Sequence, residues 1–306
     1  MKTMNKTTLF LLLTFFISFS AAGIYKLLDG PGTGTAGFTL LGTFYMFIPT
    51  ICVLIVQKLV HKESIKADLL ISFKINKWFF VAWLLMPTIM FATICVNLLF
   101  PNVSFNPEMT GFFDRLSNTI TPQQMTIVKQ QINSLPINVI WIILGQGLIA
   151  GISINALAAF GEELGWRGFL LKAFKEMKFF KAALLIGIIW GLWHAPLILM
   201  GHNYPQHPQI GVLMMTIMCI LLTPLLLYIT IKSKSVIAAS IMHGSMNATA
   251  GIPIMAIKGG TDLTSGIAGL AGFITVTLVL IVIFIYDVYI SKDKVFIMRM
   301  SESLGK

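Results

Sequence analysis

The most chemically informative residues of this sequence are charged side chains inside an apolar segment. Glu162, Glu163 and Arg167 follow the uncharged run Ile137–Phe160 and precede Phe169 and its apolar neighbours. A charge near the centre of a bilayer costs about 2.5–3.5 kcal/mol on insertion scales, and such residues usually face a partner or a water-filled cavity. Three charges kept in such a place therefore indicate a functional site.

Two other apolar segments contain further polar residues. One carries His194, and the other carries His243 and Asn247. Counted at ~1.5 Å per helical residue from the nearest lysine-rich boundary, Glu162, His194, His243 and Asn247 lie about 14–20 Å deep. Three segments thus place their polar groups in one depth band, which predicts that these groups meet.

Helix geometry separates the roles of the charged residues. Residues four apart share a helix face, whereas adjacent residues point about 100° apart. Glu163 and Arg167 are therefore expected to pair, a role more structural than catalytic. Glu162 has no cation near it in the sequence and is expected to project into the helix bundle.

The same spacing joins the remaining polar residues in pairs. His243 and Asn247 are four apart and should form one donor-rich patch. Trp190 and His194 are also four apart, so the indole is expected to pack on the imidazole, chiefly as a packing residue. Each histidine alone could equally form a hydrogen bond that holds two membrane helices together.

Taken together, these side chains predict hydrolysis of a carbonyl compound. A positioned carboxylate can serve as general base, here Glu162, and His194 can help it hold a water molecule. His243 and Asn247 can donate to a developing oxyanion, where losing one donor typically costs about 10²–10³ in rate. The predicted activity is water activation inside a membrane.

The composition is that of an integral membrane protein. Of 306 residues, 56% are apolar and 11% are charged, and the mean hydropathy is +0.84. A soluble domain has about 25% charged residues. The net charge of +10 is explained by membrane topology, so no nucleic-acid partner is expected. The three cysteines match no metal-binding spacing and are expected to be buried hydrophobes.

Hydropathy predicts an all-α, polytopic protein with about eight transmembrane helices. The runs are too long and too continuously apolar for barrel strands. We interpret residues 1–306 as a single membrane domain, with four motif-bearing core helices in 137–257. The fourth span is overlong and is expected to tilt or break near Gly145–Gly151. The expected spans are Thr8–Leu27, Gly37–Lys58, Trp78–Phe100, Ile137–Leu170, Ala182–Met200, Ile210–Ile231, Val236–Ile257 and Ala268–Ile290.

Lysine and arginine positions orient the expected bundle. With the N-terminus inside, 17 of the 22 fall on the cytoplasmic side, and Arg167 lies within the membrane. We therefore expect a multi-pass protein of the cell membrane with both termini in the cytoplasm. The first span is expected to remain uncleaved, although Ser20–Gly23 is similar to a signal-peptide cleavage site. The preference for lysine over arginine suggests a bacterial source. The outer loop Pro101–Pro136 is expected to contain a short helix over Thr119–Asn133.

The three motifs together resemble the CPBP family of CAAX-processing and bacteriocin-processing intramembrane proteases, also called Abi. The chain carries Glu-Glu-x-x-x-Arg, then aromatic-x-x-x-His, then His-x-x-x-Asn, in that order and over roughly residues 137–257. The family often has Phe where this chain has Trp190. Each motif alone is weak, but the ordered set is specific.

The resemblance implies an endopeptidase that cleaves a membrane-associated peptide or protein. It implies that Glu162 and His194 activate water, that His243 and Asn247 form the oxyanion hole, and that Glu163, Arg167 and Trp190 support them. The family has been described as glutamate-dependent and as metal-dependent. We favour a metal-free site, while Glu162, His194 and His243 would be the ligands of a zinc ion.

The depth of the polar residues in the membrane predicts that cleavage takes place near the cytoplasmic leaflet. Leader peptides, pheromone precursors or bacteriocin-related peptides are better expected substrates than prenylated CAAX proteins, by family analogy. The alternative is a non-catalytic bacteriocin-immunity or partner-binding membrane protein that uses the polar cluster for docking. A transporter is less favoured because the sequence shows no inverted repeat.

Overall fold

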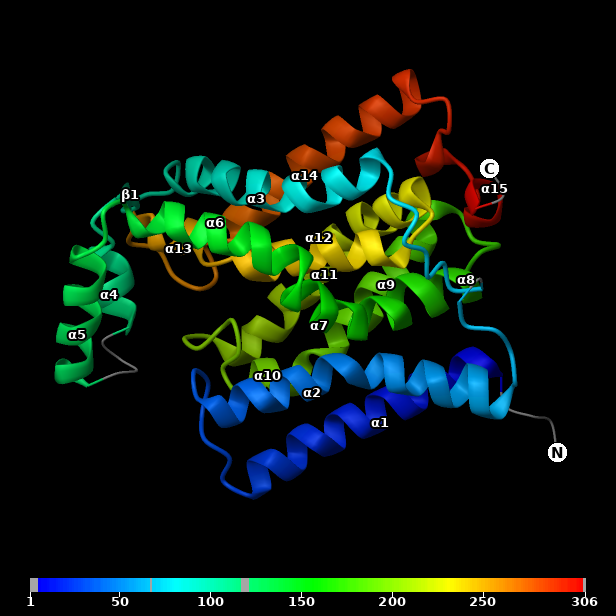
Figure 1. Cartoon of the computed structure of the whole chain (residues 1–306), viewed down its shortest axis with the longest axis horizontal. Helices are drawn as coiled ribbons and strands as arrows, with labels where there is room; N and C mark the ends of the chain where they lie inside the picture. The colour runs from blue at the N-terminus through cyan, green and yellow to red at the C-terminus, as the bar shows by residue number, and fades with distance from the viewer. Residues whose placement is uncertain (1–4, 67, 117–120, 305–306) are drawn as a thin grey trace.

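The computed structural model describes residues 5–66, 68–116 and 121–304 and is an all-α bundle (Figure 1). Within these ranges the sheet content is one two-stranded antiparallel pair, β1 (Ser104–Phe105) with β2 (Ile257–Lys258). The fold class predicted from hydropathy is therefore confirmed.

Helices account for nearly all other regular structure. In chain order they are α1 (Lys6–Leu27), α2 (Ala36–Val53) with its π-helical extension η1 (Leu54–Val60), α3 (Lys77–Asn97), α4 (Thr110–Leu116), α5 (Pro122–Asn133), α6 (Val139–Ile152), α7 (Ile154–Glu163), π-helical η2 (Leu164–Leu170), α8 (Leu171–Ala173), α9 (Phe179–Trp193), α10 (Ala195–Leu199), α11 (Pro208–Ser233), α12 (Val236–Thr249), α13 (Ile252–Met255), α14 (Leu270–Ile285), π-helical η3 (Tyr286–Ile290), 3₁₀-helical η4 (Val295–Ile297) and α15 (Met300–Leu304).

The predicted number of eight spans is not confirmed. The described part of the chain has five helices long and apolar enough to cross a membrane, and six if the bent pair α6 and α7–α8 counts as one. The helices α9 and α12 are shorter. Pro196 stands at the start of α10, directly after α9, and Pro253 lies in α13 beyond α12. Because proline cannot donate a backbone hydrogen bond, these helices end before a full crossing. His194 directly follows the end of α9, and His243 lies in the middle of α12.

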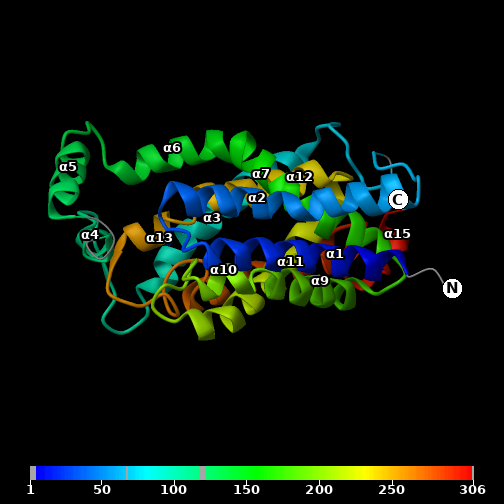
Figure 2. The same ribbon diagram turned by 90° about the horizontal axis from the view of Figure 1, so that it is seen from below.

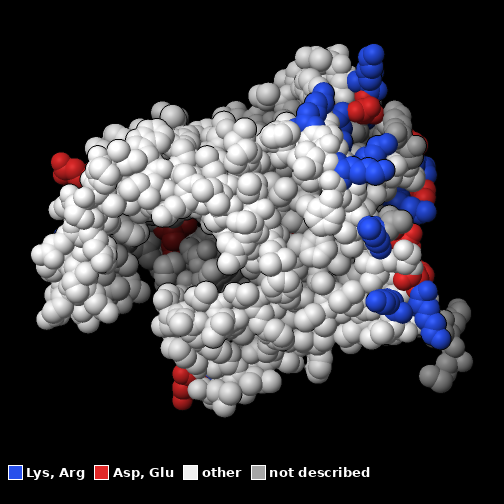
Figure 3. Space-filling view, in the orientation of Figure 1, with Lys and Arg blue, Asp and Glu red and all other residues white. Residues whose placement is uncertain are grey.

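The basic residues gather at one end of the bundle (Figure 3). Lys and Arg side chains cover the end where the N- and C-termini lie, and the opposite end carries few of them (Figures 1 and 3). Lys172 pairs there with Asp68 at 2.8 Å. Lys6 donates to Glu63 and holds the pKa of that carboxyl below its usual value. This segregation is what the positive-inside rule expects of a membrane protein.

The outer-loop helix lies at the other end of the molecule. The helices α4 and α5 project from the bundle on the side opposite the termini in both views (Figures 1 and 2). The helix α5 lies within the predicted range Thr119–Asn133, with Thr121 as its cap and Pro122 as its first residue, while Thr119 lies outside the described residues. The short strand pair tethers the start of this loop to the end of α13.

The fourth predicted span is broken, as its length suggested. The helices α6 and α7 meet at Ser153 with a bend of 50°. The helix α12 crosses at this break, because small residues face one another there. A Cβ on Gly244 would lie 2.5 Å from the backbone nitrogen of Ala156, and one on Gly151 would lie 2.9 Å from the Cα of Ser245. This close approach sets His243 beside the end of α7.

Replacing Gly244 with alanine is expected to lower the melting temperature in detergent, because backbone atoms at the break would have to move. Gly145→Ala on α6 is the matched control, since no atom lies within 4 Å of its added Cβ. There the change should be neutral or slightly stabilising, as a helix-interior glycine costs about 0.5–1 kcal/mol relative to alanine. Equal melting temperatures for the two variants would contradict this account of the crossing.

Candidate active site

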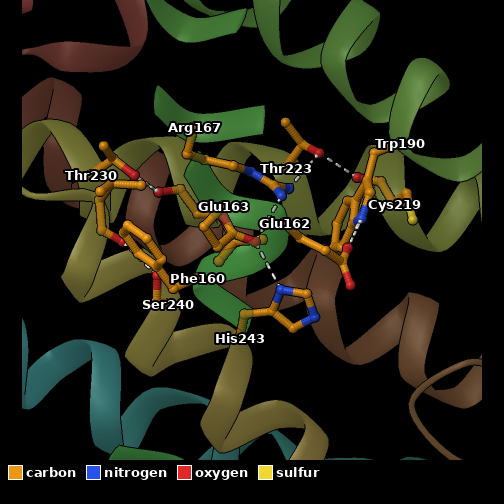
Figure 4. A network of polar contacts seen from close by, with 12 residues as sticks. Phe160, Glu162, Glu163, Arg167, Trp190, Cys219, Thr223, Thr230, Ser240 and His243 are labelled. Carbon is orange, nitrogen blue, oxygen red and sulfur yellow. Dashed lines mark hydrogen bonds and ion pairs between the residues drawn. The ribbon is translucent and has the colours of Figure 1, made fainter. Parts of the chain in front are cut away.

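The charged residues of the first motif form a buried network with the third motif (Figure 4). Arg167 donates to Glu163 Oε1 at 3.0 Å, which confirms the predicted pairing four residues apart. His243 Nδ1 lies 2.8 Å from the same carboxylate oxygen. Both Glu163 and Arg167 have no exposed surface. A single carboxylate thus joins α7 to η2 and to α12.

Arg167 has two further contacts that hold its guanidinium. It donates to Thr223 Oγ1 on α11 at 3.1 Å, and that hydroxyl donates in turn to the backbone oxygen of Cys219 at 2.6 Å. The guanidinium carbon lies 4.1 Å from the centre of the Trp190 ring on α9. Such a cation–π contact is strongest when it is desolvated, as it is here. Arg167 therefore links three helices to η2.

Glu162 takes no part in the Glu163–Arg167 pair and points in another direction, as the helix geometry predicted. Its Oε2 accepts a hydrogen bond of 2.6 Å from the indole nitrogen of Trp190, and the residue is 2% exposed. Oε1 has no hydrogen-bond partner among the residues described. Unlike Glu163 Oε2, it is not one of the fully buried atoms that lack a partner, so a small part of its surface is accessible.

The hydrogen-bond partners of His194 and His243 show which ring nitrogen of each imidazole carries the proton. His194 Nδ1 lies 2.8 Å from the carbonyl oxygen of Trp190, which can only accept, so Nδ1 carries the proton. In the neutral ring, Nε2 is then an acceptor, suited to a water molecule. His243 Nδ1 faces the Glu163 carboxylate and is likewise the donor. Its Nε2 becomes a second donor only when the ring is cationic.

The structure places the predicted site residues at different degrees of exposure. Asn247 is exposed and His194 is partly exposed, whereas His243 and every residue of η2 are buried. No hydrogen bond ties the Asn247 amide to another described side chain. The site is thus covered toward the lysine-rich end and accessible toward the end of α12. Figure 3 shows the molecule hollowed in its lysine-poor half.

The donor atoms have the chemistry of a zinc site but not its spacing. Each imidazole uses Nδ1 for a protein contact and leaves Nε2, and Glu162 leaves Oε1, a set that zinc accepts. Within the described ranges, however, no three His, Cys, Asp or Glu side chains are grouped closely enough to hold a metal ion. The arrangement as it stands does not fit a metal, and the zinc alternative stays a prediction.

The segment that carries the three motifs is similar to a known protein family. Residues 136–249 match the model of the family described as type II CAAX prenyl endopeptidase Rce1-like. The match covers the motif-bearing part of the chain and shows a likeness to that family there. The chain is also 49% identical over 49 residues to CAAX prenyl protease 2 of Methanococcus maripaludis. That alignment spans 16% of this chain and 18% of the relative.

The segment that matches the Rce1-like model contains all three motifs, close to the boundaries inferred from the sequence. It contains neither α1 nor α2, which nevertheless touch the site. Ser18 accepts from the indole of Trp193 at 2.7 Å, and Tyr45 donates to the Trp193 backbone oxygen at 2.7 Å. The Trp193 ring packs edge-on against His194. These contacts and Thr223 were not predicted, because a hydroxyl in an apolar helix gives no distinctive sequence signal.

Proposed function

We propose that this protein is a CPBP-type intramembrane endopeptidase that hydrolyses a peptide bond in a membrane-associated peptide or protein. The observation that carries the proposal is the arrangement of Glu162. Its carboxylate is fixed through Oε2 and free at Oε1, and the partly exposed imidazole of His194 directly follows α9, the helix of the Trp190 that holds it. A fixed base and a group that can accept from water are what hydrolysis of an amide requires.

The proposed reaction uses only side chains of this chain. Glu162 Oε1 takes a proton from water that His194 Nε2 helps to orient, and the hydroxide adds to the substrate carbonyl carbon. His243 Nε2–H and the Asn247 amide donate to the oxyanion. The protonated Glu162 then delivers its proton to the leaving nitrogen as the C–N bond breaks. Glu163 holds His243 in the donor form and Arg167 balances the charge.

A cleavage assay tests the proposal. Purified protein in lipid vesicles should cut a peptide with an apolar segment at one internal bond, as shown by two new masses. Leader-type and prenylated CAAX-type peptides are separate arms, and the leader type is expected to be cut. We expect activity to survive treatment with a zinc chelator. Loss on chelation that zinc restores would replace the glutamate mechanism with a metal mechanism, and no cleavage of any peptide would reject the proposal.

We also propose that the lysine-rich end faces the cytoplasm of a bacterial cell. Lys175 follows α8 at that end and Glu108 lies between β1 and α4 at the other, and both are exposed (Figure 1). In a background without the native cysteines, a Lys175→Cys variant should react with a membrane-impermeant maleimide only after permeabilisation. Glu108→Cys should react in intact cells. The reverse pattern would invert the orientation and the leaflet near which cleavage is expected.

A further inference from the structure

Trp190 does more at this site than fill space. The residue is 1% exposed, and its indole nitrogen lies 2.6 Å from Glu162 Oε2. One ring face is covered by the Arg167 guanidinium at 4.1 Å, and the ring packs edge-on against His243 with 5.5 Å between centroids. Its position is therefore fixed by the same network that holds the oxyanion-hole histidine. A rigid donor on one carboxylate oxygen fixes the direction of the other.

The neighbouring tryptophans show that such a bond is not an automatic result of burial. Trp166 is fully buried, yet its indole nitrogen has no hydrogen-bond partner in the described structure. Trp193 is 1% exposed and donates to a serine hydroxyl. Of these three indoles, Trp190 donates to a carboxylate. Charge-assisted hydrogen bonds are shorter and roughly twice as strong as neutral ones.

We propose that Trp190 is a positioning residue, which binds Glu162 Oε2 and aims Oε1 at the substrate water. This inference rests on the proposed function, since it assigns Trp190 a role in the same reaction. A fixed carboxylate does not populate orientations that cannot react with the water. A misplacement of about 1 Å can cost about 10²-fold in rate. The contribution is made to the chemical step and not to the binding of the peptide.

A matched pair of phenylalanine variants tests the kinetic role. Trp190→Phe keeps an aromatic face for Arg167 and removes the donor, and we expect kcat to fall about tenfold or more with KM unchanged. Trp166→Phe makes the same change at a buried indole without a partner, so its kcat should stay within about twofold of wild type. Equal losses in both variants, or an unchanged kcat in Trp190→Phe, would overturn the positioning role.

A double-mutant cycle tests the bond without using activity. Melting temperatures are measured for wild type, Trp190→Phe, Glu162→Ala and the double variant. The Trp190 change should lower the melting temperature by about several degrees in wild type and by much less beside Glu162→Ala. Trp166→Phe should cost the same in both backgrounds. Coupling without any peptidase activity would reject the proposed function and leave the bond standing, whereas additive effects would reject the bond.

Discussion

Replacing Glu162 with glutamine is expected to lower kcat by about 10²–10⁴-fold, the usual contribution of a general base. The amide keeps the shape of the side chain and still offers an oxygen to the Trp190 indole, so the fold and the peptide KM should be preserved. What it loses is the ability to take a proton at Oε1. The measurement is single-site cleavage by purified wild-type and variant protein in the same vesicles, with folding checked by melting temperature.

Glu176→Gln is the control for the Glu162 variant. Glu176 is exposed at the lysine-rich end, and its replacement should leave kcat unchanged. Equal cleavage by Glu162→Gln and wild type would remove Glu162 from the mechanism. A cellular test addresses the alternative of a non-catalytic immunity or docking protein. If Glu162→Ala, His194→Ala and His243→Ala all kept the cellular phenotype at normal protein levels, that alternative would be favoured.

Much of the site geometry could be predicted because it depends on helix periodicity. The Glu163–Arg167 pair and the different direction of Glu162 both follow from 3.6 residues per turn, and both are present. The convergence of the first and third motifs followed from equal depth. It is present in the contact between Glu163 and His243. Local rules and membrane depth were sufficient for these features.

Contacts across helices could not be predicted from spacing. The sequence favoured Trp190 as a packing partner of His194, and the rings are 5.7 Å apart. The indole nitrogen, however, finds Glu162 on another helix, and no periodicity reveals that. The count of eight spans was unconfirmed for a related reason. Hydropathy cannot show that a helix ends partway, as at Trp193 and Thr249, when the short helices that follow, α10 and α13, are also apolar.

The fully buried ion pair predicts the largest effect on stability. Arg167→Met would leave the Glu163 carboxylate without its cation at a site with no exposed surface, and Glu163→Met would strand the guanidinium. Breaking a buried pair on one side typically costs about 3–5 kcal/mol, because a charge stays buried without compensation. We expect a loss of that order in the free energy of unfolding for each single variant. Reversible denaturation in one detergent measures it.

The double variant Glu163→Met/Arg167→Met separates two contributions to the free energy of unfolding. One is the net stabilisation by the ion pair, and the other is the cost of a buried charge without a partner. Replacing both partners by apolar side chains is often neutral or stabilising, so it should be less destabilised than either single variant. Lys172→Met is the comparison at the surface. Its pair with Asp68 is 37% exposed on each side and should contribute under about 1 kcal/mol. If the two single losses simply added in the double variant, Glu163 and Arg167 would act independently. The salt bridge would then not be what holds η2 and His243 in place.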